Sequence, residues 1–211
     1  MDAMEKQIAS LVADADSVQL APSPLILWLK WMAIAVVYIV ISLLVLGVRS
    51  DVWVRLHSAM FLAEMGVLVA IVATTALSAS LLAYPDMYQR SRWTLIPIFM
   101  FVIFVGVIAL AWQADNPSSP PPVHSYQCSL TIAVLALLPA AWMFYSMRQL
   151  ASTHRRFAGG VVMLSAFSIG AVTLRLSEQT NSIIHVIEWH YLPMIGVALL
   201  GVWLGKRLLK W

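Results

Sequence analysis

The stretch HVIEWHYLPM, residues 185–194, places two histidines and a glutamate beside a tryptophan and a tyrosine. His185 and Glu188 are three residues apart, and His190 follows Glu188 by two residues. Imidazole and carboxylate groups bind Zn²⁺ or Cu²⁺ in proteins, and imidazole also exchanges protons near neutral pH. This set of side chains therefore has the chemistry of a metal-binding or signal-sensing site.

A second pair of ligand type lies upstream, because a histidine precedes the single cysteine of the chain by four residues. Cysteine at the start of a helix is commonly just a small apolar residue. His190, between Trp189 and Tyr191, fits the aromatic belt that forms where helices leave a membrane. The sequence therefore predicts no bound metal or other cofactor. The weak candidates for metal ligands are His124, Cys128, His185 and His190.

The elements that must position these groups are membrane-spanning helices. Apolar residues make up 61% of the 211 residues and charged residues 11%, whereas a soluble domain carries about a quarter charged residues. A helix of roughly 20 apolar residues crosses the ~30 Å hydrocarbon core. Six apolar segments reach about that length, at 25–48, 59–84, 93–112, 128–147, 157–176 and 187–204. The predicted fold is all-α, a polytopic bundle of six transmembrane helices forming a domain over residues 25–211.

The cations of the chain are distributed unequally between the two ends of the predicted bundle. Cytosolic loops of membrane proteins carry an excess of lysine and arginine. The ends and loops on the side of the N-terminus carry Lys6, Arg90, Arg92, Arg148, Arg155, Arg156, Lys206, Arg207 and Lys210. The opposite side carries Arg49, Arg55 and Arg175. We therefore expect both termini in the cytosol and the 185–194 stretch at the outer surface. The charge bias follows topology and anionic lipid, and it predicts no direct contact with nucleic acid.

Residues 1–24 form a separate, cytosolic N-terminal segment. Its apolar residues follow the spacing of one helical face, and they are Met4, Ile8, Leu11, Val12 and Ala15. The acidic residues lie elsewhere around the helix, whereas a membrane-surface helix is rich in lysine and arginine. An acidic amphipathic helix is suited to a groove on a partner protein. The alternative is a weakly helical leader with no partner. Pro22 and Pro24 separate this segment from the first span.

Charged residues near the outer surface have both structural and functional interpretations. Arg49 and Asp51 are expected to pair in the loop after the first span, and the same loop could form a sensing surface. Glu64, about one turn into the second span, needs a partner or a proton if it is buried. Arg55 or a group at the head of the last helix could supply the partner, and otherwise Glu64 is hydrated at the interface.

Little in the chain points to catalysis or transport. No pair of nucleophile and base is visible, and no histidine lies in mid-helix where haem ligands would be, so we expect no enzyme. Pro97 and Pro139 predict kinks within two spans, which are the one hint of a small transporter or channel subunit as the alternative function. Gly201 and Gly205 predict close helix packing, either within the chain or between chains.

Several motifs occur in a fixed order along the chain: GVRSD, SAMFLAEM, YPDMYQR, YQCSL, FAGGVVMLSAFSIGAV, VIEWHYLPM and the terminal GVWLGKRLLKW. In this order, over about 200 residues, the chain resembles the NrsF family of six-helix inner-membrane anti-sigma factors. The resemblance implies a protein that retains a sigma factor of the extracytoplasmic-function (ECF) type at the bacterial inner membrane and releases it on an envelope or stress signal. The sigma contact would then be the face of the N-terminal segment, together with loops 84–92 and 148–156 and their arginines.

One feature departs from that family. Its members tend to carry a second outer cysteine shortly after the fifth helix, where this chain has Ser177 in LRLSEQT. A thiol pair within one chain is therefore excluded, and replacing Cys128 with alanine is expected to leave signalling intact. The candidates for sensing the signal are then Arg49, Asp51, Glu64, Cys128, His185, Glu188, Trp189 and His190.

Overall fold

The computed structural model describes residues 3–14, 21–85, 92–114, 126–180 and 182–210. These ranges are helical with short turns and contain no strand, which confirms the all-α prediction. The helices are α1 (Ala3–Asp14), α2 (Pro24–Leu46), α3 (Val52–Arg55), α4 (Ala59–Leu82), α5 (Ile96–Ala114), α6 (Tyr126–Arg148), α7 (Arg155–Ser177), α8 (Ile183–His185) and α9 (Pro193–Leu208). A 3₁₀ turn, η2 (Arg92–Leu95), precedes α5, and a π-helical turn, η3 (Val186–Tyr191), joins α8 to α9.

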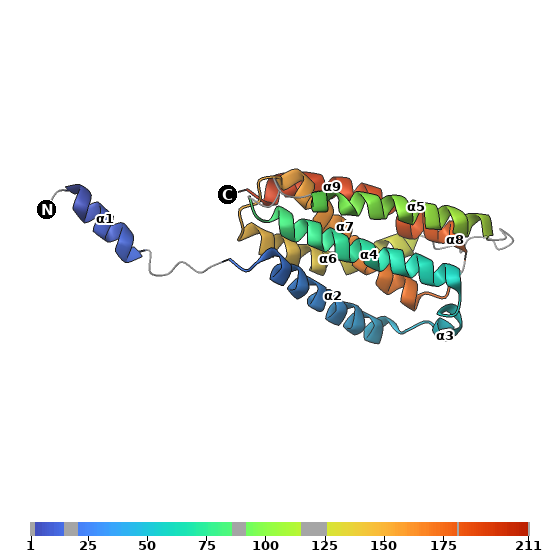
Figure 1. Ribbon diagram of the computed structural model, residues 1–211. Helices are drawn as coiled ribbons and strands as arrows, with labels where there is room; N and C mark the ends of the chain where they lie inside the picture. The colour runs from blue at the N-terminus through green and yellow to red at the C-terminus, as the bar shows by residue number, and fades with distance from the viewer. Residues whose placement is uncertain (1–2, 15–20, 86–91, 115–125, 181, 211) are drawn as a thin grey trace.

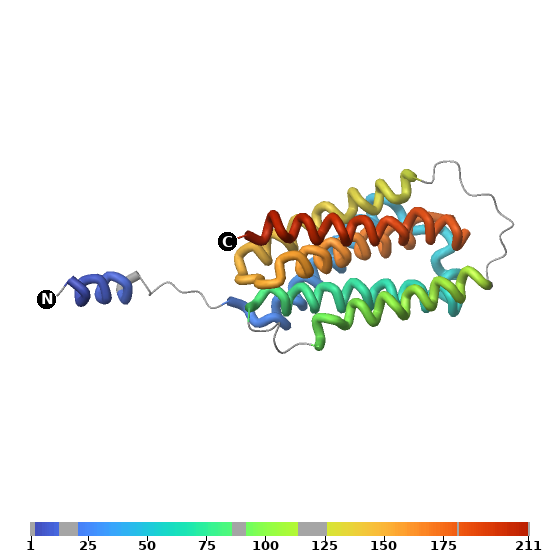
Figure 2. The backbone as a smooth tube through the Cα atoms, turned by 90° about the horizontal axis from the view of Figure 1, so that it is seen from above, coloured from blue at the N-terminus to red at the C-terminus, as the bar shows by residue number. Residues whose placement is uncertain are grey.

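Six helical segments of the described chain are long and apolar enough to cross a membrane. They lie side by side in one bundle, and both chain ends are at the same end of it (Figure 1). α7 is the central helix: 83% of the residues in its 18-residue apolar stretch are buried, compared with 56% or less in each of the other five spans. α2, α4, α6 and α9 pack against α7, and α5 packs against α4 (Figure 2). The outer spans present much of their apolar surface outward, where lipid would contact it.

α7 and α9 pack backbone to backbone through glycines. A Cβ atom on Gly159 would lie 2.3 Å from the carbonyl oxygen of Gly201, and a Cβ on Gly205 would lie 2.1 Å from the carbonyl oxygen of Arg155. Only glycine permits so close an approach of two helices. The predicted close packing is confirmed, and these contacts form within one chain.

The prolines of the spans leave carbonyl groups that other helices satisfy. Pro139 lies inside α6 and cannot donate to the carbonyl of Leu135, which instead accepts a hydrogen bond of 2.8 Å from the Tyr38 hydroxyl of α2. Pro97, the other predicted kink, lies at the start of its α-helix rather than in the middle. α5 begins at Ile96, directly after the 3₁₀ turn η2, so Pro97 is in the first turn of the α-helix, where proline is best tolerated.

The last span differs most from its predicted form. Helical structure begins at Ile183 rather than at 187, because the Ser182 side chain caps the backbone N–H of His185. A π-helical turn follows, in which the Leu192 N–H donates to the Ile187 carbonyl five residues earlier, at 2.8 Å. His185 and His190 therefore lie within the helical segment and not in a loop.

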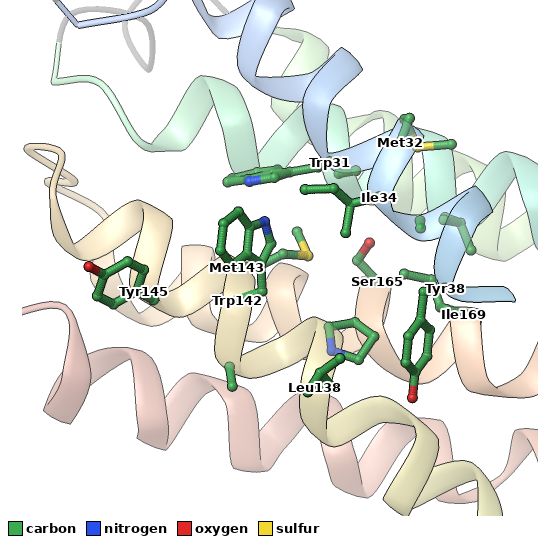
Figure 3. A pocket seen from close by; sticks show the side chains of 15 residues that line it. Trp31, Met32, Ile34, Tyr38, Leu138, Trp142, Met143, Tyr145, Ser165 and Ile169 are labelled. Carbon is green, nitrogen blue, oxygen red and sulfur yellow. The ribbon is translucent and has the colours of Figure 1, made fainter. Parts of the chain in front are cut away.

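α2 packs against α6 less tightly than its neighbours pack against each other. A pocket of about 490 Å³ separates the two helices and reaches α7. Figure 3 shows Trp31, Met32 and Tyr38 of α2 facing Trp142 and Met143 of α6 across it. Apolar and aromatic side chains make up most of its lining, so it is an apolar recess on the side of the bundle.

Candidate functional site

Buried charged groups gather at the end of the bundle opposite the termini. Arg175, near the end of α7, donates two hydrogen bonds to Glu64 of α4, from Nε at 2.8 Å and from Nη2 at 3.1 Å. Both residues are buried, with 6% and 3% of their surface exposed. A two-fold contact between guanidinium and carboxylate is among the strongest pairings available to buried charges. It fixes the N-terminal end of α4 against the C-terminal end of α7.

Two further groups complete this ion pair. Tyr191 of η3 donates its hydroxyl hydrogen to the Glu64 carboxylate, and Nη1 of Arg175 donates to the carbonyl oxygen of Thr180 at 3.0 Å. The interpretation of Glu64 as hydrated at the interface is wrong, because it is buried among these partners. Arg55 is not its partner. Tyr191, at the head of the last span, is the alternative partner that the sequence predicts for Glu64.

The loop after α2 contains a second, shallower ion pair. Arg49 donates from Nε and Nη2 to the two carboxylate oxygens of Asp51, at 2.6 and 3.0 Å, which confirms the predicted pairing. Arg55 adds a contact to Asp51 at 3.3 Å. The hydrogen bond from Arg49 is the main cause that lowers the pKa of Asp51 to about 2. The loop joins the buried cluster because the Arg49 and Arg175 guanidiniums lie 5.7 and 5.3 Å from the centre of the Phe61 ring.

Beside these ion pairs lies a group that we call the outer cluster, made up of Cys128, Glu178, His185 and His190. Its four ligand-type atoms lie within 4.8 Å of one another. Glu178 is central: its Oε1 lies 3.4 Å from the Cys128 sulfur and 3.5 Å from Nε2 of His185, and its Oε2 lies 2.9 Å from Nε2 of His190. Cys128, the two histidines and Glu178, which the sequence did not single out, thus form one site.

The carboxyl group of Glu178 is held in its charged form. Burial opposes its ionisation, but the adjacent His190 ring and the Thr180 hydroxyl favour the charged form more strongly and lower the pKa of Glu178 to about 2. Thr180 donates to Oε1 at 2.7 Å. The outer cluster therefore has a fixed negative charge beside two imidazole rings.

The predicted sensing residues are only partly brought together. Cys128, His185 and His190 are in the outer cluster, whereas Glu188 is exposed and Trp189 is half-buried. The aromatic-belt interpretation of His190 is wrong, since only 1% of its surface is exposed. His124 lies outside the described residues.

Sequence reasoning missed three residues at this end of the bundle. Arg175 was counted as a topology signal, Tyr191 as a belt residue, and Glu178 was passed over beside Ser177. Ser177 donates its hydroxyl hydrogen to the Leu174 carbonyl at 3.1 Å, as a helix-terminal residue does. The available signal was the position of an acid directly after a long apolar span, on the same side as the histidines.

At the other end, α1 presents unpaired apolar side chains. Met4, Ile8, Leu11 and Val12 are 69%, 54%, 66% and 66% exposed. The helix stands apart from the bundle (Figures 1 and 2). Ala15, the fifth predicted contact, lies outside the described residues. An apolar helical face left in water is a candidate protein-binding surface.

A basic pocket lies where α7 begins and α9 ends. It has a volume of about 450 Å³ and is lined by Thr153, His154, Arg155, Arg156, Phe157, Lys206 and Lys210. Arg155 and Arg156 were expected at a partner surface, whereas Lys206 and Lys210 were not. Arg92 and Arg148 are exposed, and Arg90 lies outside the described residues. The pocket favours an acidic surface as its partner.

The bundle, the detached amphipathic helix and the buried outer cluster define a class: a polytopic helical membrane protein with a candidate protein-binding segment. A family model described as "Negative regulator of sigma F" matches residues 11–211. The chain belongs to this family, NrsF, as its motifs predicted.

Two curated relatives agree with this assignment. The chain is 27% identical over 217 residues to the "Probable anti-sigma-F factor NrsF" of Azospira oryzae, covering 98% of this chain and 99% of the relative. It is 24% identical over 139 residues to the "Anti-sigma-F factor NrsF" of Caulobacter vibrioides, covering 64% of this chain and 65% of that relative. No solved structure matches the chain.

Proposed function

We propose that the chain is a non-enzymatic anti-sigma factor of the bacterial inner membrane. With both termini in the cytosol, it holds an ECF-type sigma factor at the membrane and releases it on an envelope or stress signal. The observation that carries this proposal is the exposed apolar face of α1 on a chain of the negative-regulator family. The relatives' names supply the class of partner, and the excess of cations near the termini supports the orientation.

The α1 face offers apolar surface that a complex would bury. Burying one Leu, Ile, Val or Met side chain stabilises an interface by about 1.5–3 kcal/mol before the costs of association. Four such side chains lie exposed on one side of α1. They would dock into an apolar groove of the sigma factor, as amphipathic helices do in other complexes.

The basic pocket provides a second contact on the same side of the bundle. Arg155 and Arg156 of α7, Lys206 of α9 and Lys210, which follows α9, would face acidic side chains of the sigma factor. Charge complementarity of this kind raises association rates and fixes orientation more than it raises affinity. We therefore assign most of the binding free energy to α1 and much of the orientation to the pocket.

The proposal is tested by capture of the sigma factor on the full-length chain in lipid nanodiscs, with an ECF sigma factor from the same genome. Replacing Ile8 and Leu11 with aspartate is expected to abolish capture, because two charges would be placed on the docking face. The matched control replaces Ser10 and Ala13 with aspartate, which adds the same charge to the opposite side of α1. Equal capture by both double variants would contradict the proposal.

The transporter or channel alternative makes a different prediction. It requires flux of a solute through liposomes that contain the purified chain, and this flux would be independent of α1. Capture of the sigma factor by a chain that passes no solute would exclude it as the main function.

A further inference from the structure

We propose that the outer cluster binds one divalent transition-metal cation, with Zn²⁺ the best match, through Cys128, Glu178, His185 and His190. The ligands come from three places in the fold: the start of α6, the turn after α7, and the α8–η3 segment. Binding at this site does not depend on the sigma factor, so it can be tested apart from the proposed function.

The spacing of the four side chains is close to that of a tetrahedral site. With bonds of ~2.0–2.3 Å, a tetrahedral ion holds its ligand atoms about 3.3–3.8 Å apart. Cys128 Sγ and Nε2 of His185 already lie 3.4 and 3.5 Å from Glu178 Oε1. All four ligand atoms lie within 4.8 Å of one another. Small side-chain rotations would therefore bring them to the spacing of a tetrahedral shell.

The histidines are buried without hydrogen bonds that satisfy them. The side chains of His185 and His190 are 0% and 1% exposed. Within the described part of the chain, the ring nitrogens of both residues have no partner of hydrogen-bond geometry, although Nε2 of each lies within 3.5 Å of the Glu178 carboxylate. Nearly all buried polar atoms in proteins have such a partner. Close nitrogen and oxygen atoms that converge without aligned hydrogen bonds are the arrangement expected of ligands around a cation.

The π-helical turn explains how two residues five apart reach one point. In an α-helix, side chains five residues apart are about 140° apart around the axis. The wider η3 turn brings the His185 and His190 rings to a centroid distance of 5.4 Å. Pro193 leaves the Trp189 carbonyl without a helical donor, and the hydroxyl of Ser129 donates to it. Because Ser129 adjoins Cys128, this bond also fixes the cysteine beside the histidines.

The set of ligands favours Zn²⁺ over other cations. One thiolate, one carboxylate and two neutral imidazoles neutralise a divalent charge, and the thiol proton leaves to water as the sulfur–metal bond forms. Mg²⁺ and Ca²⁺ require six or more oxygen ligands and are excluded. The Thr180 hydroxyl, which donates to Glu178 at 2.7 Å, supplies the outer hydrogen bond that orients a ligating carboxylate.

The test uses the full-length chain in lipid nanodiscs, stripped of metal with a chelator and titrated with Zn²⁺ against a chelating indicator. One equivalent per chain is expected, with affinity reduced at least about tenfold in the Glu178→Gln, His190→Gln and Cys128→Ser variants. Titration with Co²⁺ is expected to give a thiolate-to-cobalt charge-transfer band that the Cys128→Ser variant lacks. Tight binding of Cu²⁺ without binding of Zn²⁺ would overturn the assignment.

Matched controls separate loss of ligands from loss of fold. Glu188→Gln changes an exposed acid two residues from His190, and His57→Gln changes an exposed histidine in the loop before α4. Both are expected to bind Zn²⁺ as the parent does. Thr180→Val, which keeps all four ligands, is expected to weaken binding by about tenfold. Absence of Zn²⁺ binding by the parent chain, or equal affinity in the Cys128, Glu178 and His190 variants, would refute the site.

Discussion

At the scale of single residues, the outer end of the bundle is held by the pair of Glu64 and Arg175. Each is buried and charged, and each is satisfied by the other and by a neighbour, Tyr191 or Thr180. A buried pair of this kind contributes less than its Coulomb energy, because both charges leave water. Replacing one partner lowers the stability far more than replacing both, since the remaining buried charge then has no counterion.

The variant Arg175→Met is therefore expected to lose about 3–5 kcal/mol in free energy of unfolding. The double variant Glu64→Leu with Arg175→Met is expected to recover most of that loss. Unfolding of the purified chain in mixed detergent micelles measures both. If the double variant is no more stable than Arg175→Met alone, the two residues do not act as a pair.

Asp51 gives a prediction about acid. Its pKa is lowered to about 2 from the ordinary value of 3.8, so its stabilising pair with Arg49 and Arg55 is complete above pH 3.8. That stabilisation is lost only as the pH falls through about 2. Backbone hydrogen exchange in the loop 49–56, corrected for its intrinsic pH dependence, is expected to show equal protection at pH 7 and pH 5. A loop that opens at pH 5 would show that this pair does not hold it.

At the scale of elements, the contact of α7 with α9 depends on glycine at particular positions. Gly205→Ala would place a Cβ atom 2.1 Å from the Arg155 carbonyl oxygen, whereas Gly196→Ala on the same helix would meet nothing within 4 Å. We expect the first to destabilise the bundle by about 1–3 kcal/mol and the second to be nearly neutral. Thermal unfolding of the two variants side by side is the measurement. Equal melting temperatures would contradict this helix contact.

The elements also show where prediction from sequence succeeded and where it failed. Six spans and the glycine contact followed from runs of apolar residues and from the spacing of small ones, which are local properties. The π-helical turn did not, because it depends on Pro193 together with Ser129, which is 64 residues earlier in the chain. Glu178 was missed for a related reason: its position directly after a long apolar span is a weak signal, and its partners come from α6 and from the last span.

At the scale of the whole molecule, the orientation in the membrane decides which site meets which compartment. The ends of α2 and α9 that adjoin the termini lie together, and the outer cluster lies at the opposite end (Figure 1). A reporter that is active only in the cytosol is expected to work when fused to the C-terminus. A reporter that is active only after export is expected to work when inserted between α5 and α6. The reverse pattern would place α1 outside and remove any contact with a sigma factor.

α7 touches both ends of this arrangement. It begins at Arg155 and Arg156 in the basic pocket and ends one residue before Glu178 of the outer cluster. Its 23 residues make an unbroken rod of about 34 Å, with no proline within it and with glycines that press it against α9. A rigid-body slide or rotation of α7 at the end that adjoins the outer cluster would also move the two arginines at its other end.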